Sequence, residues 1–394
     1  MLKRLGPSVI PAGETTCAAH FEQRLEFNPP VHENWNIVHI GMLVPEVHQI
    51  YVCGVNCMRG VVLTAAEMAA SDRFSCVILR EEDVIDGTLW ETTRDGIADV
   101  LRKLPKLPPC VIVFPVCTHH FAGVDMASVY RALEAEFPTV DFIGAWMDPI
   151  MQKHGLPPDQ RLRKAMYDPL RPCDPMPKTV TVVGAEFPLD AEADLRRLLC
   201  SGGYAMREIH DCKTYAEYLA LAQGEHFAAA FPGGFFGAKQ LAKRLGRPCH
   251  LLPMSFDYEE ISASLHSFAD ALKIVPLDDA AEMKLCEDAL SEAKNAIGDA
   301  PIAIDMLFHP RPLGLAKLLL QHGFRVTEVY LDAVAPEEEP ALDWLREHAP
   351  ALELSSIILP ELRVAERTRA EKTLAIGPKA AWFTGTDFFV NLVQ

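Results

Sequence analysis

Three segments near the start of the chain decide the fold. They are IYVCGVNCMRG (50–60), RFSCVILREEDVIDGTLWETTRDGI (73–97) and VIVFPVCTHHFAGVDM (111–126). Each contains a run of β-branched, aromatic or aliphatic residues, which predicts a strand buried on both faces, as in a parallel sheet. The middle segment continues through an acidic turn into a helix. This alternation predicts an α/β fold whose ligand site lies where the strands end.

Thiols and imidazoles directly follow two of these strands. A Cys-Gly-x-x-Cys turn joins Cys53 to Cys57, and the third segment runs into Cys117, His119 and His120. The glycine in the turn lets the backbone approach a ligand closely. Because thiolates are soft donors that suit iron–sulfur clusters, the two strand ends predict a site for such a cluster.

The same alternation of strands and helices recurs twice farther along the chain. A second block opens at TVTVVGAE (179–186), after the proline-rich segment DPLRPCDPMPK (168–178), which is typical of a linker. A third block opens at PIAIDMLF (301–308) and closes with TLAIGPKAAWF (373–383). We therefore predict three Rossmann-like, parallel-sheet α/β domains around a central cleft. Their predicted ranges are 1–175, which holds the cluster cysteines, 176–295 and 296–394.

Composition limits the possible classes of function. The chain has 394 residues, 49% of them hydrophobic, and a formal net charge of −17. Nucleic-acid binding is not expected, because neutralising phosphates requires clustered Lys and Arg; an acidic surface suits a basic protein partner instead. Eleven cysteines without a signal-peptide pattern predict reduced thiols or metal ligands. No segment reaches the ~18 apolar residues of a membrane span, so we expect a cytoplasmic protein with no membrane association.

Five other cysteines lie within apolar runs of the sequence. Free cysteine is among the most buried residue types, so the expected role of each is that of a small hydrophobic side chain. We therefore predict core positions for Cys76, Cys110, Cys200, Cys249 and Cys286.

Neither glycine-bearing loop of the chain has a nucleotide-binding pattern. TVVGAEFP, after the strand at 179, lacks the Gly-x-Gly-x-x-Gly loop that brings a pyrophosphate to a helix N-terminus. GGFFGAKQ (233–240) has the wrong spacing for a phosphate loop, and Gln240 replaces the hydroxyl that would bind Mg²⁺. The chain is therefore not expected to bind ATP or NAD itself.

Taken together, a set of motifs resembles component 1 of the nitrogenase superfamily, which includes nitrogenase proper and the dark-operative protochlorophyllide reductases. The resemblance covers nearly the whole chain. In order, the motifs are the turn from Gly54 to Cys57, the segment from Leu79 to Gly87, Cys117 with the following Phe121 to Asp125, the helix from Phe236 to Pro248, and Leu374 to Lys379.

In that family a cluster lies at the interface of two component 1 subunits, held by thiolates of the first domain. The resemblance implies Cys17, Cys57 and Cys117 as the metal ligands, with Cys53 as a further cofactor-binding candidate. The family's turn commonly reads His-Gly-Pro-x-Gly-Cys, whereas this chain's turn is one residue shorter and carries a second thiol. The sequence therefore leaves open whether Cys53 or Cys57 binds the cluster, and whether the cluster is of the 4Fe–4S or the 8Fe type.

His119 and His120 are candidate catalytic residues, as donors of a proton or a hydrogen bond near the cluster. Because adjacent residues point in different directions, we expect at most one of them to act. A FeMo-type cofactor is not expected. In nitrogenase its anchors are a cysteine of the second domain and a histidine near the C-terminus. The matching strand of this chain reads HFAAAF, with Ala230 or its neighbours at the first position, and the chain ends at Gln394, about where the second would begin.

The resemblance implies the catalytic subunit of a nitrogenase-like two-component reductase. Its expected partners are a homologous component 1 chain, in a homo- or heterodimer, and a homodimeric ATP-dependent iron–sulfur reductase that supplies low-potential electrons. The expected substrate is not dinitrogen. Two alternatives are a scaffold for metallocluster assembly and a non-catalytic partner subunit of such a complex.

Overall fold

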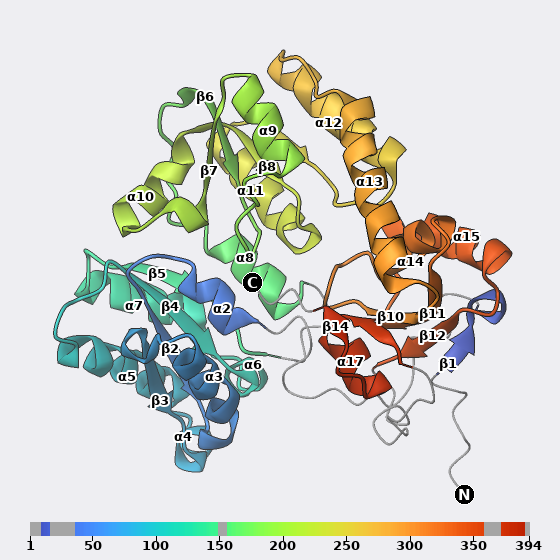
Figure 1. Ribbon diagram of the computed structural model, residues 1–394. Helices are drawn as coiled ribbons and strands as arrows, with labels where there is room; N and C mark the ends of the chain where they lie inside the picture. Colours follow the sequence, from blue (N-terminus) through green and yellow to red (C-terminus); the bar gives the residue numbers. More distant parts are fainter. Residues whose placement is uncertain (1–8, 16–35, 149–155, 358–371, 391–394) are drawn as a thin grey trace, which may run out of the picture. The chain divides into compact units, whose positions relative to one another are not determined.

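The computed structural model describes residues 9–15, 36–148, 156–357 and 372–390. Within these residues, two compact units can be distinguished. The central unit is drawn from Pro30–Pro253, and the terminal unit is drawn from Met1–Pro29 together with Met254–Gln394. In both units, helices cover parallel-strand sheets (Figure 1).

The first sheet of the central unit has the order β3-β2-β4-β5, with all strands parallel. Every residue of β2 and β4 is buried, as expected for inner strands covered on both faces. The polar side chains of β2 find partners there: the Tyr51 hydroxyl donates to Gln49 Oε1 at 2.9 Å, and Gln49 Nε2 donates to the Val38 carbonyl at 3.0 Å. The strands are β2 (Val47–Cys53), β3 (Phe74–Ile78), β4 (Cys110–Pro115) and β5 (Asp141–Gly144).

Helices make the connections between these parallel strands, because a tight turn cannot join strands that run in the same direction. The long helix α5 buries Thr93, Ile97 and Leu101 and leaves its other face in solvent, whereas the short α4 has no buried residue. The helices of this part are α2 (Ile37–Met42), α3 (Val55–Glu67), α4 (Glu81–Ile85), α5 (Leu89–Lys103), α6 (Cys117–Phe121) and α7 (Met126–Glu136).

The second sheet of the central unit has the order β7-β6-β8-β9 and is also entirely parallel. Its strands are β6 (Met176–Val182), β7 (Ala205–Glu208), β8 (Gly224–Ala229) and β9 (Cys249–Leu251), which lies at an edge. The helices are α8 (Pro158–Ala165), α9 (Asp194–Ser201), α10 (Tyr215–Leu219) and α11 (Phe235–Leu245). Gly246, with φ +66°, ends α11 in the left-handed conformation that glycine adopts readily.

The sheet of the terminal unit has the order β1-β12-β11-β10-β13-β14. Only β1 (Val9–Pro11) among its described strands runs antiparallel to its neighbour. The others are β10 (Pro301–Asp305), β11 (Arg325–Leu331), β12 (Glu353–Ser356), β13 (Leu374–Ile376) and β14 (Phe389–Val390). The helices are α12 (Tyr258–Leu272), α13 (Asp279–Ile297), α14 (Pro312–Gln321), α15 (Glu339–His348) and α17 (Pro378–Thr384).

The predicted α/β class with parallel-strand sheets is confirmed. In the structure, β1 joins the sheet of the terminal unit, and α12 and α13 belong to that unit. The antiparallel pairing of β1 with β12 joins residues near opposite ends of the sequence, which no local pattern encodes. The domain boundaries and the central cleft stay predictions.

The cysteines predicted to be in the core fall into three groups. Cys110 is buried as predicted, and Cys76 and Cys249 are partly buried. The prediction is wrong for Cys200 and Cys286, which are exposed. The reason is their position on helices: α9 buries its leucines and leaves Cys200 on its outer face, and α13, which carries Cys286, has no buried residue.

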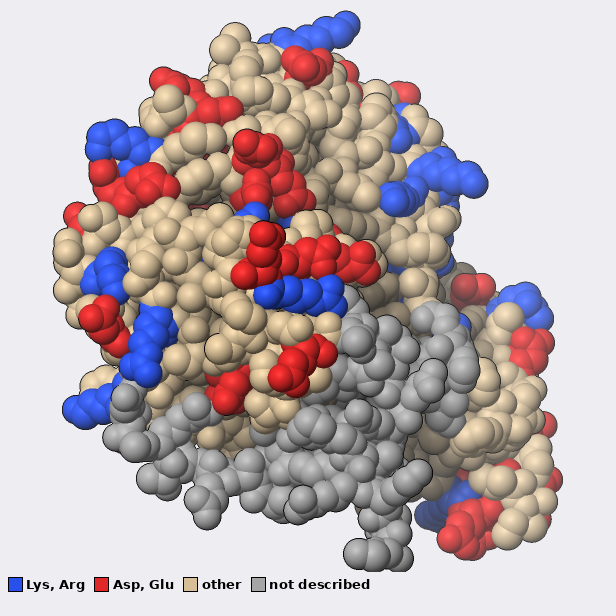
Figure 2. Space-filling view, turned by 90° about the vertical axis from the view of Figure 1, so that its right-hand side faces the viewer, with Lys and Arg blue, Asp and Glu red and all other residues tan. Residues whose placement is uncertain are grey.

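None of the helices in the described ranges is long and apolar enough to span a bilayer. Figure 2 shows acidic side chains in several groups on the face that it draws, with basic side chains beside some of them. On this face the acidic residues of the chain thus form separate patches.

Candidate active site

Cys57 lies at the carboxyl end of the first sheet, on the first turn of α3. The chain leaves β2 at Cys53, passes Gly54 in an extended conformation and enters the helix, where the Cys57 amide donates to the Gly54 carbonyl at 3.0 Å. The Cys57 side chain is exposed. An exposed thiol in the first turn of a helix is accessible to a metal ion, so this position suits a metal ligand.

Cys53, the other thiol of the turn, points into the core. It is the last residue of β2 and is fully buried. Burial, followed by the nearby Cys76 and Cys57, raises the pKa of the Cys53 thiol to about 12. A thiol of this kind stays protonated at neutral pH, whereas metal ligation requires the thiolate. The geometry thus favours Cys57 over Cys53 as a ligand.

Cys117 begins α6, immediately beyond the neighbouring strand β4. Because β2 and β4 are paired in parallel, with Val52 opposite Pro115, both strands end at the same edge of the sheet. The Cys117 side chain is partly buried. Burial, and then the charges of Asp148 and Cys57, raise the pKa of the Cys117 thiol. Cys57 and Cys117 thus lie close enough for the charge of one thiolate to affect the other.

Cys17 lies outside the described residues. Within the described part of the chain, no group of three or more His, Cys, Asp or Glu side chains has an arrangement that could hold a metal ion. The described residues therefore supply two neighbouring thiols at this edge, and a cluster there would need further ligands.

His119 is the buried residue of α6, and its side chain links this helix to α5. Its Nδ1 accepts from the Val116 amide at 3.2 Å, and its Nε2 lies 2.9 Å from the Thr93 hydroxyl, which in turn donates to the Leu89 carbonyl at 2.6 Å. Since Nδ1 accepts, Nε2 carries the proton and donates to Thr93. Burial lowers the pKa of His119 to about 4, so the ring is neutral at pH 7. These contacts give His119 the geometry of a residue that positions α6; a catalytic role for it stays a prediction.

His120 points the other way and is exposed. Its Nδ1 lies 3.7 Å from Oδ2 of the buried Asp148, and its ring meets the edge of Trp146 with centroids 6.1 Å apart. The two adjacent histidines therefore have opposite orientations. Of the two, His120 is the one that solvent reaches, so it is the one that could deliver a proton near Cys117.

Several exposed apolar side chains lie on the elements that reach the same end of the first sheet as the two thiols. We call them the apolar rim; they are between 39% and 79% exposed and belong to α3, the end of β3, α4 and α6. The helices α3, α4 and α6 follow the carboxyl ends of the parallel strands β2, β3 and β4 (Figure 1). The rim was not predicted from the sequence, although apolar residues inside the acidic turn 81–87 were a signal for it. The residues are Val55, Ile78, Val84, Ile85 and Phe121.

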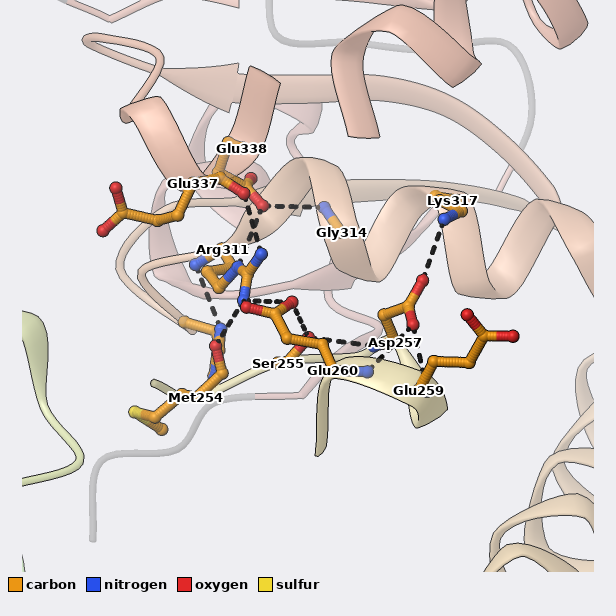
Figure 3. Close-up of polar contacts among 11 residues, drawn as sticks. Met254, Ser255, Asp257, Glu259, Glu260, Arg311, Gly314, Lys317, Glu337 and Glu338 are labelled. Atoms are coloured by element: carbon orange, nitrogen blue, oxygen red, sulfur yellow. Dashed lines mark hydrogen bonds and ion pairs between the residues drawn. The ribbon is translucent and has the colours of Figure 1, made fainter. Parts of the chain in front are cut away.

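A separate cavity of about 760 Å³ lies in the terminal unit, beside α14. The buried Arg311 lines this cavity, and its guanidinium contacts the carboxylate of Glu260 at 2.8 Å and the carbonyls of Met254 and Glu337 at 2.8 and 2.7 Å (Figure 3). Glu338 lies 3.6 Å from Arg311 Nε. No local motif predicts this network, because its members come from three distant segments.

Glu338 also holds the N-terminus of α14. Its carboxylate accepts from the amides of Leu313 and Gly314 at 2.6 and 3.1 Å, which satisfies donors that a helix leaves unpaired at its start (Figure 3). Burial raises the pKa of Glu338 to about 6, and the amides and Arg311 oppose this shift. The Arg and Lys side chains that line the cavity thus form ion pairs with nearby carboxylates. Arg311 pairs with Glu260 and Glu338, and Lys317 pairs with Asp257 at 3.1 Å. These contacts hold the segments 254–260, 311–317 and 337–338 together, and we call this network the clamp.

No protein-family model and no curated protein matches the sequence. Among solved structures, the chain is similar to "Nitrogenase Cp1 at pH 6.5", with a TM-score of 0.62 and 12% identity over 100% of this chain and 88% of that one. It is also similar to "Nitrogenase Cp1 at pH 5", with a TM-score of 0.58 and 13% identity over 91% and 81% of the two chains. At this level of identity the similarity shows a nitrogenase-like fold.

Proposed function

We propose that the chain is the catalytic, component 1 subunit of a nitrogenase-like two-component reductase, and that Cys57 and Cys117 bind an iron–sulfur cluster at a subunit interface. The proposal rests on the convergence of these two thiols at one sheet edge, in a fold shared with nitrogenase chains. Such a cluster, when bound, supplies one-electron transfer at low potential.

The residues present fit such a cluster. Cys57 is exposed in the first turn of α3, and Cys117 is partly buried at the start of α6. Two thiolates from one chain leave the cluster half enclosed, and Cys17 or a second chain would complete the shell. The apolar rim supports the second chain, because exposed apolar side chains grouped on one surface mark protein interfaces.

The chain's own residues would orient the Cys117 thiol and hold a proton near the site. His119 fixes α6 and thereby Cys117, while His120, exposed beside Asp148, would hold a proton at Nδ1 or Nε2 close to the site. Ala230, which follows β8, offers no side chain to ligate a FeMo-type cofactor. We therefore propose a substrate other than dinitrogen.

Electron transfer from a partner tests this function. Anaerobic protein is mixed with a homodimeric ATP-dependent iron–sulfur reductase and MgATP, and the loss of the reductase's EPR signal is followed in time. We expect ATP-dependent transfer and no ATP hydrolysis by the isolated chain. A loaded chain that accepts no electrons would favour the scaffold instead, and co-purification with a homologous, substrate-binding chain would favour a non-catalytic partner role. ATP hydrolysis by the chain alone would contradict the two-component proposal.

Arg59 tests where the reductase docks. This residue is on α3, two positions after Cys57. If it contacts an acidic patch of the reductase, Arg59→Glu slows electron transfer several-fold at low salt and weakens its dependence on ionic strength, because surface charges mainly govern encounter. The iron content should not change. Arg131→Glu, on α7, is the matched control with an exposed arginine. Equal transfer rates in both variants would exclude Arg59 from the docking surface.

A further inference from the structure

Two histidines on neighbouring strands of the second sheet face each other. His226 Nδ1 lies 3.1 Å from His250 Nε2, and the ring centroids are 5.2 Å apart with a tilt of 38°. Parallel register places His250 of β9 opposite Ala228 of β8, two residues after His226, so both imidazoles project from the same face. Both side chains are half-buried. This pair is on a different sheet from Cys57 and Cys117.

The distance between the two nitrogens matches a shared metal ion. Two imidazole nitrogens, each about 2.0–2.1 Å from one ion, lie about 2.9 Å apart at a right angle and about 3.3 Å apart at a tetrahedral angle. The observed 3.1 Å falls between these values. An ion can therefore take the place of the proton that the two rings share, with a change of ring tautomer and a small ring rotation, and without movement of either strand.

The two side chains are of the right chemical type for such an ion, and a neighbouring ring restrains one of them. Neutral imidazole is the metal-binding form, and it suits Zn²⁺, Ni²⁺ and Cu²⁺. Tyr204 packs edge-on against His226, with centroids 6.3 Å apart, and restricts that ring from one side.

We propose that His226 and His250 form a two-histidine site for a divalent late first-row metal ion, which fastens the edge strand β9 to β8. No third His, Cys, Asp or Glu of the described ranges joins the pair in a metal-binding arrangement. The remaining coordination positions are therefore filled by water or by an anionic group of a ligand. The site is independent of the proposed reductase function.

Zinc titration of the full, reduced chain tests this site. We expect His226→Gln and His250→Gln each to bind one Zn²⁺ fewer per chain than the native protein, while His266→Gln, an exposed histidine paired with Asp279, binds as much as the native protein. Glutamine keeps a hydrogen-bonding group at each position, and circular dichroism verifies folding. Unchanged zinc stoichiometry in both variants would overturn the proposal.

X-ray absorption and thermal unfolding give a second readout that cysteine binding cannot imitate. In a Cys57→Ser, Cys117→Ser background, the first bound Zn²⁺ should show only nitrogen and oxygen neighbours, with imidazole scattering. Added Zn²⁺ should raise the unfolding temperature of this protein and should not do so after His226→Gln, because a ligand that binds only the folded state stabilises it. Sulfur neighbours at the first site, or equal thermal shifts with and without His226, would contradict a two-histidine site.

Discussion

Cys57→Ala and Cys117→Ala should each remove most of the iron from protein prepared without air. Each substitution deletes one of the two thiols that converge at the end of the first sheet, and a cluster cannot keep its geometry with an open iron position there. Iron and acid-labile sulfide, measured per chain after anaerobic purification, report the loss.

The controls separate ligation from general thiol binding. Cys200→Ala removes a thiol that is also exposed but lies on α9, and it should leave the iron content unchanged. Cys53→Ala should also keep the iron, because the Cys53 side chain is buried and its pKa is about 12. Loss of iron in Cys53→Ala together with full retention in Cys57→Ala would reverse the assignment within the turn.

Arg311→Met should destabilise the terminal unit by about 3–5 kcal/mol, the typical cost of removing one partner from a buried ion pair. The substitution leaves the buried Glu338 carboxylate without its cation, and the carbonyls of Met254 and Glu337 lose the hydrogen bonds that Arg311 donates. Protonation of Glu338, whose pKa is about 6, would reduce the cost at lower pH. Hydrogen exchange of peptides covering 301–321 should accelerate accordingly, because their amides belong to β10 and α14.

Lys317→Ala is the matched control for the same cavity. Lys317 pairs with Asp257 at 3.1 Å, but both side chains are partly exposed. Surface pairs of this kind contribute about 0–1 kcal/mol, so the exchange of the same peptides should change little. Equal effects of the two substitutions would show that Arg311 is not the centre of the clamp.

The strands that carry the site could be predicted because their signals are local. The apolar runs that end at Cys53 and Pro115 are long enough to be recognised as buried strands, and the residues that follow them must lie at the carboxyl edge. The same reasoning assigns Cys57 and Cys117 to one edge of the sheet. It could not choose between Cys53 and Cys57, since burial depends on where the helix begins after Gly54.

Features made by distant residues could not be predicted from the sequence. The pairing of Val9–Pro11 with β12, the Arg311 network and the approach of His226 to His250 all join segments whose proximity is set by tertiary packing. The exposure of Cys200 has a related cause: an apolar run on a helix has an outward face, and only the packed structure shows which residues occupy it.

Whether the chain carries a cluster at all is decided by the iron, acid-labile sulfide and EPR spectrum of the native protein, purified without air and reduced with dithionite. We expect iron and sulfide in similar amounts, a paramagnetic iron–sulfur signal in the reduced protein, and loss of that signal on exposure to air. Native protein that is folded but free of iron and sulfide, and that acquires neither when cluster assembly is reconstituted, would contradict the proposed function.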